Sequence, residues 1–195
     1  EYNSRNFIYV SIGKGIGATI VSNGNIICGN NESAGEFGHL IIQPEGPLCS
    51  CGSRGCLETF SSERAIVQTV KRLLEEGRES RLRALAERNE LSGEDIVSAA
   101  EQGDEAALEA VDASCKYLAI GLINLIRMLD PATIRIMNSI SESDELFKKL
   151  ILKYVKIYSL GNYEWNTQIE FETNKWICRD GAATMVLDDL YGNVR

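Results

Sequence analysis

The chain has 195 residues, of which 44% are hydrophobic and 25% charged, and its formal net charge is −8. This composition is typical of a globular protein with room for one good hydrophobic core. The negative charge argues against nucleic-acid binding by these residues themselves, because neutralising phosphates requires clustered Lys and Arg. No apolar run approaches the roughly 18 residues that a membrane-spanning helix needs, so no membrane partner is expected.

The first part of the sequence predicts an antiparallel meander. Residues 7–12 form a continuous apolar and β-branched run, the pattern of a buried strand, and two further strands are expected over residues 16–21 and 25–28. Ser22-Asn23-Gly24 separates the last two, and Asn-Gly between such runs is the strongest short hairpin signal. A loop then leads to another apolar run, Leu40-Ile41-Ile42.

Helical patterns follow the meander. Ser61 and Ser62 are candidate caps for a helix over residues 66–74, and Ser92-Gly93-Glu94-Asp95 resembles a capping box that opens a helix ending at Gly103. The longest helix is expected from residue 104 to 129, where Asp130-Pro131 stops it. Its apolar stripe has spacings of three and four and comprises Leu108, Val111, Cys115, Leu118, Leu122, Leu125 and Leu129.

The last part of the sequence alternates between strands and helices. We expect a strand over residues 133–137, a helix over 143–158, a strand over 168–171 and a helix over 179–191. Alternation of this kind predicts parallel strands joined by right-handed crossovers. The sequence therefore predicts an α/β protein whose mixed sheet begins as a meander and continues as βαβα units.

One cluster of residues matches a metal site. The only histidine in the chain, His39, precedes three closely spaced cysteines, Cys49, Cys51 and Cys56. One imidazole and three thiolates fill a tetrahedral shell around Zn²⁺ and leave no position for water, which is typical of a structural zinc and not of a catalytic one. We expect one structural zinc per chain, stapling a loop over residues 36–58. Four buried residues unrelated to any metal are the alternative.

The remaining cysteines and the start of the chain carry expectations of their own. Cys28, Cys115 and Cys178 lie in apolar sequence and are expected to be buried free thiols. Because the chain lacks the features of a small secreted disulfide scaffold, a reducing, cytoplasmic environment is expected. The chain begins without Met and reaches a strand-like run at Phe7, so we expect that an N-terminal part of the protein precedes it.

The residues around the metal cluster resemble a known family signature. Glu36-Phe37-Gly38-His39, followed by Cys-x-Cys-Gly-x-x-Gly-Cys-Leu-Glu over residues 49–58, is similar to the double signature of the ROK family. That family contains repressors, uncharacterised reading frames and sugar kinases. The likeness covers most of the chain, because it extends to residues 9–17, 25–29, 118–131 and 181–183.

The resemblance implies a fold and a set of site residues. The fold would be one lobe of the actin-like ATPase, or ribonuclease H-like, architecture. His39 would be a zinc ligand beside a sugar pocket, and Glu36, His39 and Glu58 would contact sugar hydroxyls. Such contacts are physically sensible, because a carboxylate accepts strong, charge-assisted hydrogen bonds from two neighbouring hydroxyls. A solvated loop charge is the alternative for Glu58 taken by itself.

A glycine-rich turn, Gly13-Lys14-Gly15-Ile16-Gly17, separates the first two expected strands. Its backbone is suited to approach a phosphate closely, and a plain tight turn is the alternative. Similar kinases have Gly-Thr-Gly here, and they carry Gly-Gly where this chain has Asn138 and Ser139, whose side chains would crowd a nucleotide. The family's first phosphate loop, Asp-x-Gly-Gly-Thr, and its general-base Asp have no match in these 195 residues.

Three functional hypotheses are compatible with these features. In the first, residues 1–195 are a single C-terminal lobe that senses a sugar in a dimeric ROK-type regulator, of the N-acetylglucosamine and xylose repressor type. That lobe would not be an enzyme, and DNA would be bound only through a helix-turn-helix N-terminal to it. In the second, the chain is the C-terminal lobe of an ATP-dependent glucokinase, fructokinase or N-acetylmannosamine kinase. In the third, it is a zinc-stapled interaction domain without a small ligand.

Overall fold

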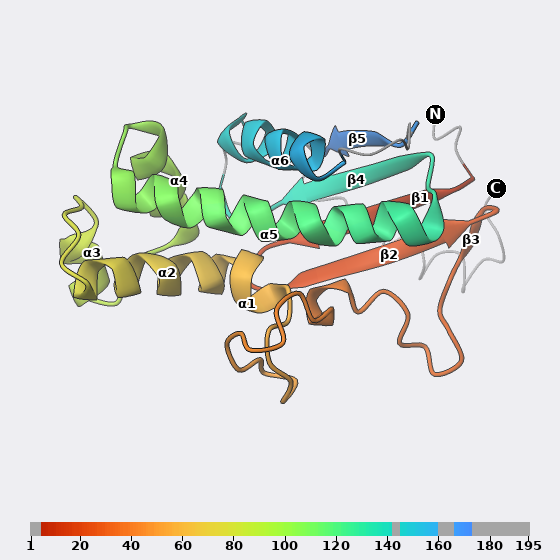
Figure 1. Ribbon diagram of the computed structural model, residues 1–195, viewed down its shortest axis with the longest axis horizontal. Coiled ribbons are helices and arrows are strands. Elements are labelled where there is room, and N and C mark those ends of the chain that lie inside the picture. The colour runs from red at the N-terminus through yellow and green to blue at the C-terminus, as the bar shows by residue number, and fades with distance from the viewer. Residues whose placement is uncertain (1–4, 142–144, 160–165, 173–195) are drawn as a thin grey trace, which may run out of the picture.

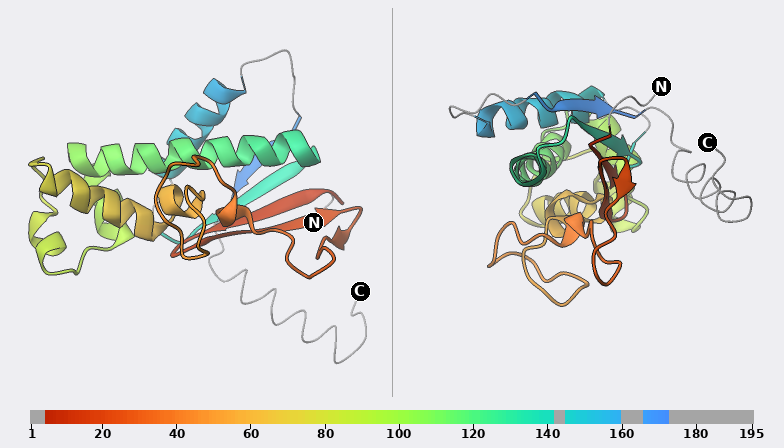
Figure 2. Two further views of the ribbon diagram at one scale, coloured as in Figure 1. Left: turned by 60° about the horizontal axis from the view of Figure 1, so that its bottom comes forward. Right: turned by 90° about the vertical axis from the view of Figure 1, so that its right-hand side faces the viewer.

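The computed structural model describes residues 5–141, 145–159 and 166–172. These residues form a five-stranded sheet in the order β3-β2-β1-β4-β5, and the long helix α5 lies across one of its faces with α6 beside it (Figures 1 and 2). The strands are β1 (Phe7–Ile12), β2 (Ile16–Ser22), β3 (Asn25–Ile26), β4 (Thr133–Asn138) and β5 (Gln168–Phe171). The helices are η1 (Phe37–His39), α1 (Glu58–Ser61), α2 (Glu63–Glu75), α3 (Arg83–Glu87), α4 (Gly93–Glu101), α5 (Glu105–Leu129) and α6 (Glu145–Tyr158).

The sheet combines the two expected kinds of strand pairing. β1 pairs antiparallel with β2, and β2 pairs antiparallel with β3. Asn23 and Gly24 join β2 to β3 with φ of 52° and 81°, the positive values that tight hairpin turns require. β4 is parallel to both β1 and β5. The predicted mixed sheet is therefore confirmed, although β3 ends at Ile26, two residues earlier than expected. The expected helix over residues 179–191 lies outside the described residues.

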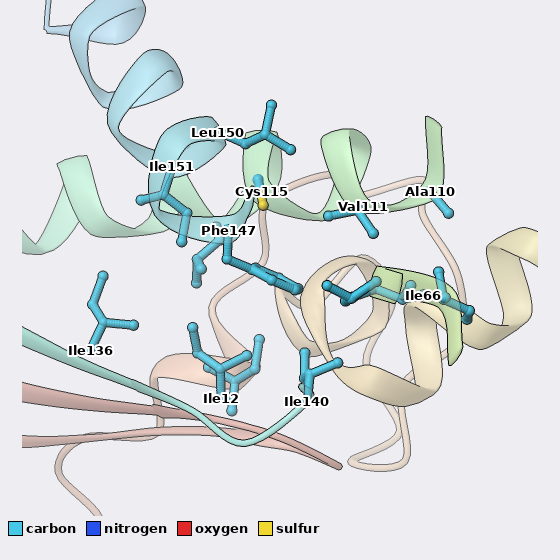
Figure 3. Close-up of a cluster of buried hydrophobic side chains, with 14 of the residues drawn as sticks. Ile12, Ile66, Ala110, Val111, Cys115, Ile136, Ile140, Phe147, Leu150 and Ile151 are labelled. Atoms are coloured by element: carbon cyan, nitrogen blue, oxygen red, sulfur yellow. The ribbon is translucent and has the colours of Figure 1, made fainter. Parts of the chain in front are cut away.

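The hydrophobic core lies between the sheet and the helices. Ile8, Val10 and Ile12 of β1 are almost fully buried, and the residues between them are half-buried, so only one face of the strand enters the core. Phe147 of α6 is completely buried in the same cluster as Ile12 and Ile136 (Figure 3). Apolar contacts therefore hold the helices against the sheet, and β2, from which the segment with the candidate site branches, is paired to the buried strand β1.

Helix α5 has the expected bounds but not all of the expected burial. Asp104 caps its first turn, and Asp130 leaves the helix in a left-handed conformation with φ of 43°. Five of the seven stripe residues are buried, but Leu108 and Leu129 are 40% and 39% exposed. In the first turns the buried face passes through Ala107 and Val111 and leaves Leu108 beside it, and Leu129 is the last residue of the helix. Among the described residues, neither α5 nor another helix combines the length and apolarity needed to cross a membrane.

The cap of α5 also fastens the segment that precedes α3. One carboxylate oxygen of Asp104 accepts a hydrogen bond from the Ala107 amide at 3.0 Å. The other oxygen accepts from the Ser80 hydroxyl at 2.8 Å and from the Arg81 amide at 3.0 Å. Burial opposes the charge on this carboxyl, but these hydrogen bonds outweigh burial and hold the pKa of Asp104 below its ordinary value.

We therefore expect Asp104→Ala to lower the free energy of unfolding by about 1–3 kcal/mol, because it removes a helix cap and leaves three donors without their acceptor. Since the folded-state pKa is the lower one, Asp104 stabilises the fold above its unfolded-state pKa, and this contribution is lost as the pH falls through the folded-state value. Urea unfolding measures both effects. The exposed neighbour Glu105→Ala is the control, and equal losses for the two variants would contradict the assignment.

Candidate functional site

Residues 35–58 run from the outer edge of β2 into the loop below the sheet (Figure 1), and close backbone contacts fix where this segment begins. The amide of Ala18 donates to the carbonyl of Gly35 at 3.1 Å. Gly35 has φ of 90°, and a Cβ at this position would lie 2.1 Å from the Ala18 carbonyl oxygen. A Cβ on Gly38 would lie 2.3 Å from the Ile16 carbonyl oxygen. Both positions therefore require glycine for the segment to reach the strand.

The four predicted metal ligands meet in this segment. The ligand atoms of His39, Cys49, Cys51 and Cys56 all lie within 4.8 Å of one another. Nδ1 of His39 is 3.5 Å from Sγ of Cys49, and Sγ of Cys51 is 3.7 Å from Sγ of Cys56. In a tetrahedral site with zinc–ligand bonds of about 2.1–2.3 Å, neighbouring ligand atoms are roughly 3.5–3.8 Å apart. The donor set and its spacing therefore fit Zn²⁺.

The cysteine loop is shaped by its own backbone. The Cys49 amide donates to the Ser53 carbonyl at 2.8 Å, and the Gly52 amide donates to the Cys49 carbonyl at 3.0 Å. Gly55 has φ of 70°, and a Cβ at this position would lie 1.5 Å from the carbonyl oxygen of Gln43. A side chain at position 55 would therefore force the two halves of the loop apart.

The three thiols of the cluster differ in their environment. Cys49 and Cys56 are buried, whereas Cys51 is exposed. The Ser53 amide lowers the pKa of Cys51 to about 7. Burial raises the pKa of Cys56 to about 12. Cys51 therefore offers a thiolate near neutral pH, and binding of a metal would displace the proton of Cys56.

The ring of His39 joins the cysteine cluster to Glu36. Its Nδ1 faces the thiols, and its Nε2 lies 3.7 Å from Oε2 of Glu36. A metal on Nδ1 would leave the Nε2 proton for this carboxylate, the usual arrangement around a metal-bound histidine. The Glu36 side chain is 67% exposed, so it can also accept hydrogen bonds from a ligand.

Glu58 is held differently from Glu36. It is the first residue of α1 and is half-buried, and its Oε2 accepts a hydrogen bond from the Ile16 amide at 3.2 Å. The alternative of a freely solvated loop charge is therefore wrong. Cys56 lies two residues before Glu58, so the end of the cysteine loop and the glycine-rich turn meet at this carboxylate.

Glu58 also lines a cavity of about 260 Å³ between the cysteine loop and the start of α2. Arg64 and Gln68 of α2 line the same cavity, and neither was expected from the sequence. The residues that line it do not include Glu36 or His39. Among the described residues, the structure thus pairs Glu36 with His39 and places Glu58 against the glycine turn and this cavity. Arg64 and Gln68 are four residues apart and therefore share one face of α2. This spacing indicates a cavity wall only when the position of α2 beside the cysteine loop is known.

The glycine turn is compact. The Gly13 amide donates to the Gly15 carbonyl at 2.9 Å, and the Gly13 carbonyl accepts from the Glu63 amide at 2.8 Å. Lys14 is exposed at its tip. Contact of this turn, including Gly17, with a phosphate stays a prediction, and the amides of Gly13 and Ile16 already have acceptors.

The side chains of Asn138 and Ser139 form hydrogen bonds with backbone groups at the ends of β4 and β1. Asn138 is buried, and its Oδ1 accepts from the Ile140 amide at 3.0 Å. The Ser139 hydroxyl donates to the carbonyl of Ile12 at 3.0 Å, and a Cβ on Gly13 would lie 2.4 Å from this hydroxyl oxygen. Both side chains therefore occupy the junction between β1, β4 and the glycine turn. Their effect on a nucleotide stays a prediction.

The cysteines outside the cluster differ from one another. Cys115 is fully buried in α5, as expected, and burial raises its pKa above the ordinary value for a thiol. Cys28 is exposed, so the expectation of a buried thiol there is wrong. The physical reason is that β3 ends at Ile26, which leaves Cys28 in the loop beyond the sheet. Cys178 lies outside the described residues.

The sequence matches the ROK family over residues 1–185. The chain therefore belongs to the ROK family. It is 36% identical over 159 residues to a glucokinase of Halalkalibacterium halodurans, a match that covers 80% of this chain and 48% of that protein. It is also 33% identical over 184 residues to a xylose repressor of Caldicellulosiruptor bescii, covering 94% of this chain and 46% of the repressor. The chain thus spans about half the length of these relatives.

Solved structures of both kinds of ROK protein share the fold. A ROK glucokinase from Streptomyces griseus, in complex with glucose and AMPPNP, superimposes with a TM-score of 0.77 at 28% identity, over 87% of this chain and 56% of the other. A ROK transcriptional regulator homologous to E. coli MLC superimposes with a TM-score of 0.74 at 32% identity, over 86% and 41% of the two chains. The fold is that of the actin-like ATPases, as expected.

Proposed function

We propose that this chain is the sugar-sensing effector domain of a ROK-type transcription regulator, forming a single C-terminal lobe. One observation carries the proposal. The metal cluster and the carboxylates of the sugar-side signature are intact, whereas the glycine turn and the end of β4 carry Lys14, Asn138 and Ser139 where ROK kinases favour other residues. The inward hydrogen bonds of Asn138 and Ser139 support this, because they use the strand ends for packing.

In this proposal one zinc ion per chain is bound by His39, Cys49, Cys51 and Cys56. When bound, the zinc supplies a rigid tetrahedral anchor and no catalysis, since its shell is full. Glu36 and Glu58 would accept hydrogen bonds from sugar hydroxyls, and His39 would orient Glu36 through its second ring nitrogen. Fixing these side chains before binding reduces the entropy lost when a sugar is held.

Sugar binding would act on DNA through an N-terminal domain, in a cytoplasmic homodimer. Linkage requires that a sugar that weakens DNA binding is itself bound more weakly, by the same factor, when DNA is present. Fluorescence anisotropy of the full-length protein on its own promoter DNA, with and without D-xylose, D-glucose or N-acetyl-D-glucosamine, tests this. We expect one of these sugars to change DNA affinity. Unchanged DNA affinity with a sugar demonstrably bound would contradict the proposal.

A sugar kinase lobe is the second candidate, and the glucokinase relative at 36% identity favours it. In that case this chain would supply one wall of the sugar site, and the phosphate loop and general base would come from outside these residues. Phosphoryl transfer depends on positioning and charge stabilisation around the nucleotide, so the residues at the glycine turn would then contact phosphate. ATP-dependent phosphorylation of a sugar by the full-length protein distinguishes this candidate from the first.

A further inference from the structure

The backbone amide of Ile16, the first residue of β2, points away from β1. Along β2, alternate residues direct their backbone groups outward: the Ala18 amide donates to Gly35, and the Ile20 carbonyl accepts from Ile27. Ile16 lies two residues before Ala18 and therefore shares this outward direction. Within the part of the chain that the structure describes, no strand pairs with this amide on that side, and the Glu58 carboxylate is its acceptor at 3.2 Å.

The same carboxylate sets the space beside Gly15. A Cβ on Gly15 would lie 2.7 Å from Oε2 of Glu58, closer than real side chains approach. The other end of the turn is held where the Glu63 amide donates to the Gly13 carbonyl at 2.8 Å. The junction of α1 and α2 therefore fastens the turn at both ends, through one backbone bond and one side chain.

We propose that Glu58 is the positioning residue of the β1–β2 turn, and that contact of a ligand with its carboxylate is coupled to the geometry of this turn. Oε2 holds the Ile16 amide, and a ligand hydroxyl that competes for the carboxylate or pulls on it must shift the turn as well. The coupling to a ligand rests on the proposed sugar site. The positioning of the turn does not, because it follows from the hydrogen bond alone.

Hydrogen exchange in the full-length protein tests the positioning, followed in peptides that cover residues 13–17. Glu58→Ala should speed exchange of the Ile16 amide by at least about tenfold, because a hydrogen bond to a charged acceptor is lost. Glu58→Gln retains an oxygen acceptor and should restore most of the protection. Glu45→Ala, an exposed carboxylate of the same loop, is the control. Equal exchange in the wild type and Glu58→Ala would overturn the proposal.

A second pair of variants tests the coupling without removing Glu58. Gly15→Ala should displace the carboxylate, whereas a Cβ on Gly17 would meet only the Ser11 hydroxyl, at 3.8 Å. We expect Gly15→Ala, and not Gly17→Ala, to change affinity for D-xylose or N-acetyl-D-glucosamine at least threefold and to speed exchange at Ile16. Equal sugar affinities in the two variants would overturn the coupling. If neither sugar nor D-glucose binds the wild type, the sugar-site proposal and the coupling fail, and the exchange result alone decides the positioning role.

Discussion

Replacing Cys56 with serine is expected to abolish metal binding and to lower the free energy of unfolding by several kcal/mol. Cys56 is completely buried, and its Sγ lies 3.7 Å from Sγ of Cys51 within the cluster. Its replacement therefore removes one of the four expected metal ligands on the buried side of the cluster. Small structural zinc sites contribute an apparent ~10–16 kcal/mol. The loss here is smaller, since the hydrophobic core between sheet and helices stabilises the rest of the fold independently.

Native mass spectrometry and chemical denaturation measure the two effects. The wild type should carry about one zinc per chain, as the four ligands require, and the Cys56→Ser variant none. Cys28→Ser is the matched control, because Cys28 is an exposed thiol outside the cluster. Chelation of the wild type should reproduce the loss of stability. A Cys56→Ser protein with wild-type stability and metal content would rule out a structural metal at this site.

The second large effect is expected at Glu36. Its carboxylate is 67% exposed beside His39, so Glu36→Ala should leave stability within about 0.5 kcal/mol of the wild type. The affinity for the sugar should fall about 10- to 100-fold, because charge-assisted hydrogen bonds to hydroxyls are removed. Isothermal titration of the full-length protein, with the sugar that gives the largest heat, measures the change.

The metal content of the Glu36→Ala variant must also be measured. A loss of metal, which would disturb the whole loop, is then distinguished from the loss of a single contact with the sugar. Glu45→Ala removes another exposed carboxylate of the same loop and should bind sugar as the wild type does. The hypothesis of an interaction domain without a small ligand makes the opposite forecast for Glu36. If no sugar binds the wild type, and if Glu36→Ala and Glu58→Ala leave the function of the full-length protein intact, that hypothesis is preferred.

Local signals in the sequence predicted the helix caps and the histidine–cysteine cluster well, because each of these residue types has a characteristic chemical role at such a position. Ser92 and Asp95 form the capping box of α4, and Ser62 caps α2 through the Ala65 amide. The spacing of one histidine and three cysteines predicted a cluster whose ligand atoms lie close together. Such features depend on a few neighbouring residues, so no knowledge of the fold is needed to find them.

Features that depend on distant contacts were not predictable in the same way. The bond between Ile16 and Glu58 joins residues 42 positions apart, and nothing in either local sequence marks it. The short helices η1, α1 and α3 have no counterpart among the expected elements, because a few residues carry no periodic pattern. The apolar run Leu40-Ile41-Ile42 forms only an isolated bridge, between Ile41 and Cys56, since glycine contacts and the cysteine loop determine its path.

The central property proposed for this domain is that it senses a sugar and does not phosphorylate it. The most direct test incubates the metal-loaded, full-length protein with D-xylose, D-glucose or N-acetyl-D-glucosamine and Mg-ATP, and follows both the heat of binding and the formation of sugar phosphate. We predict that one sugar binds and that no sugar phosphate forms above the protein-free background. Sustained, ATP-dependent conversion of that sugar into its phosphate would show that the protein is a kinase.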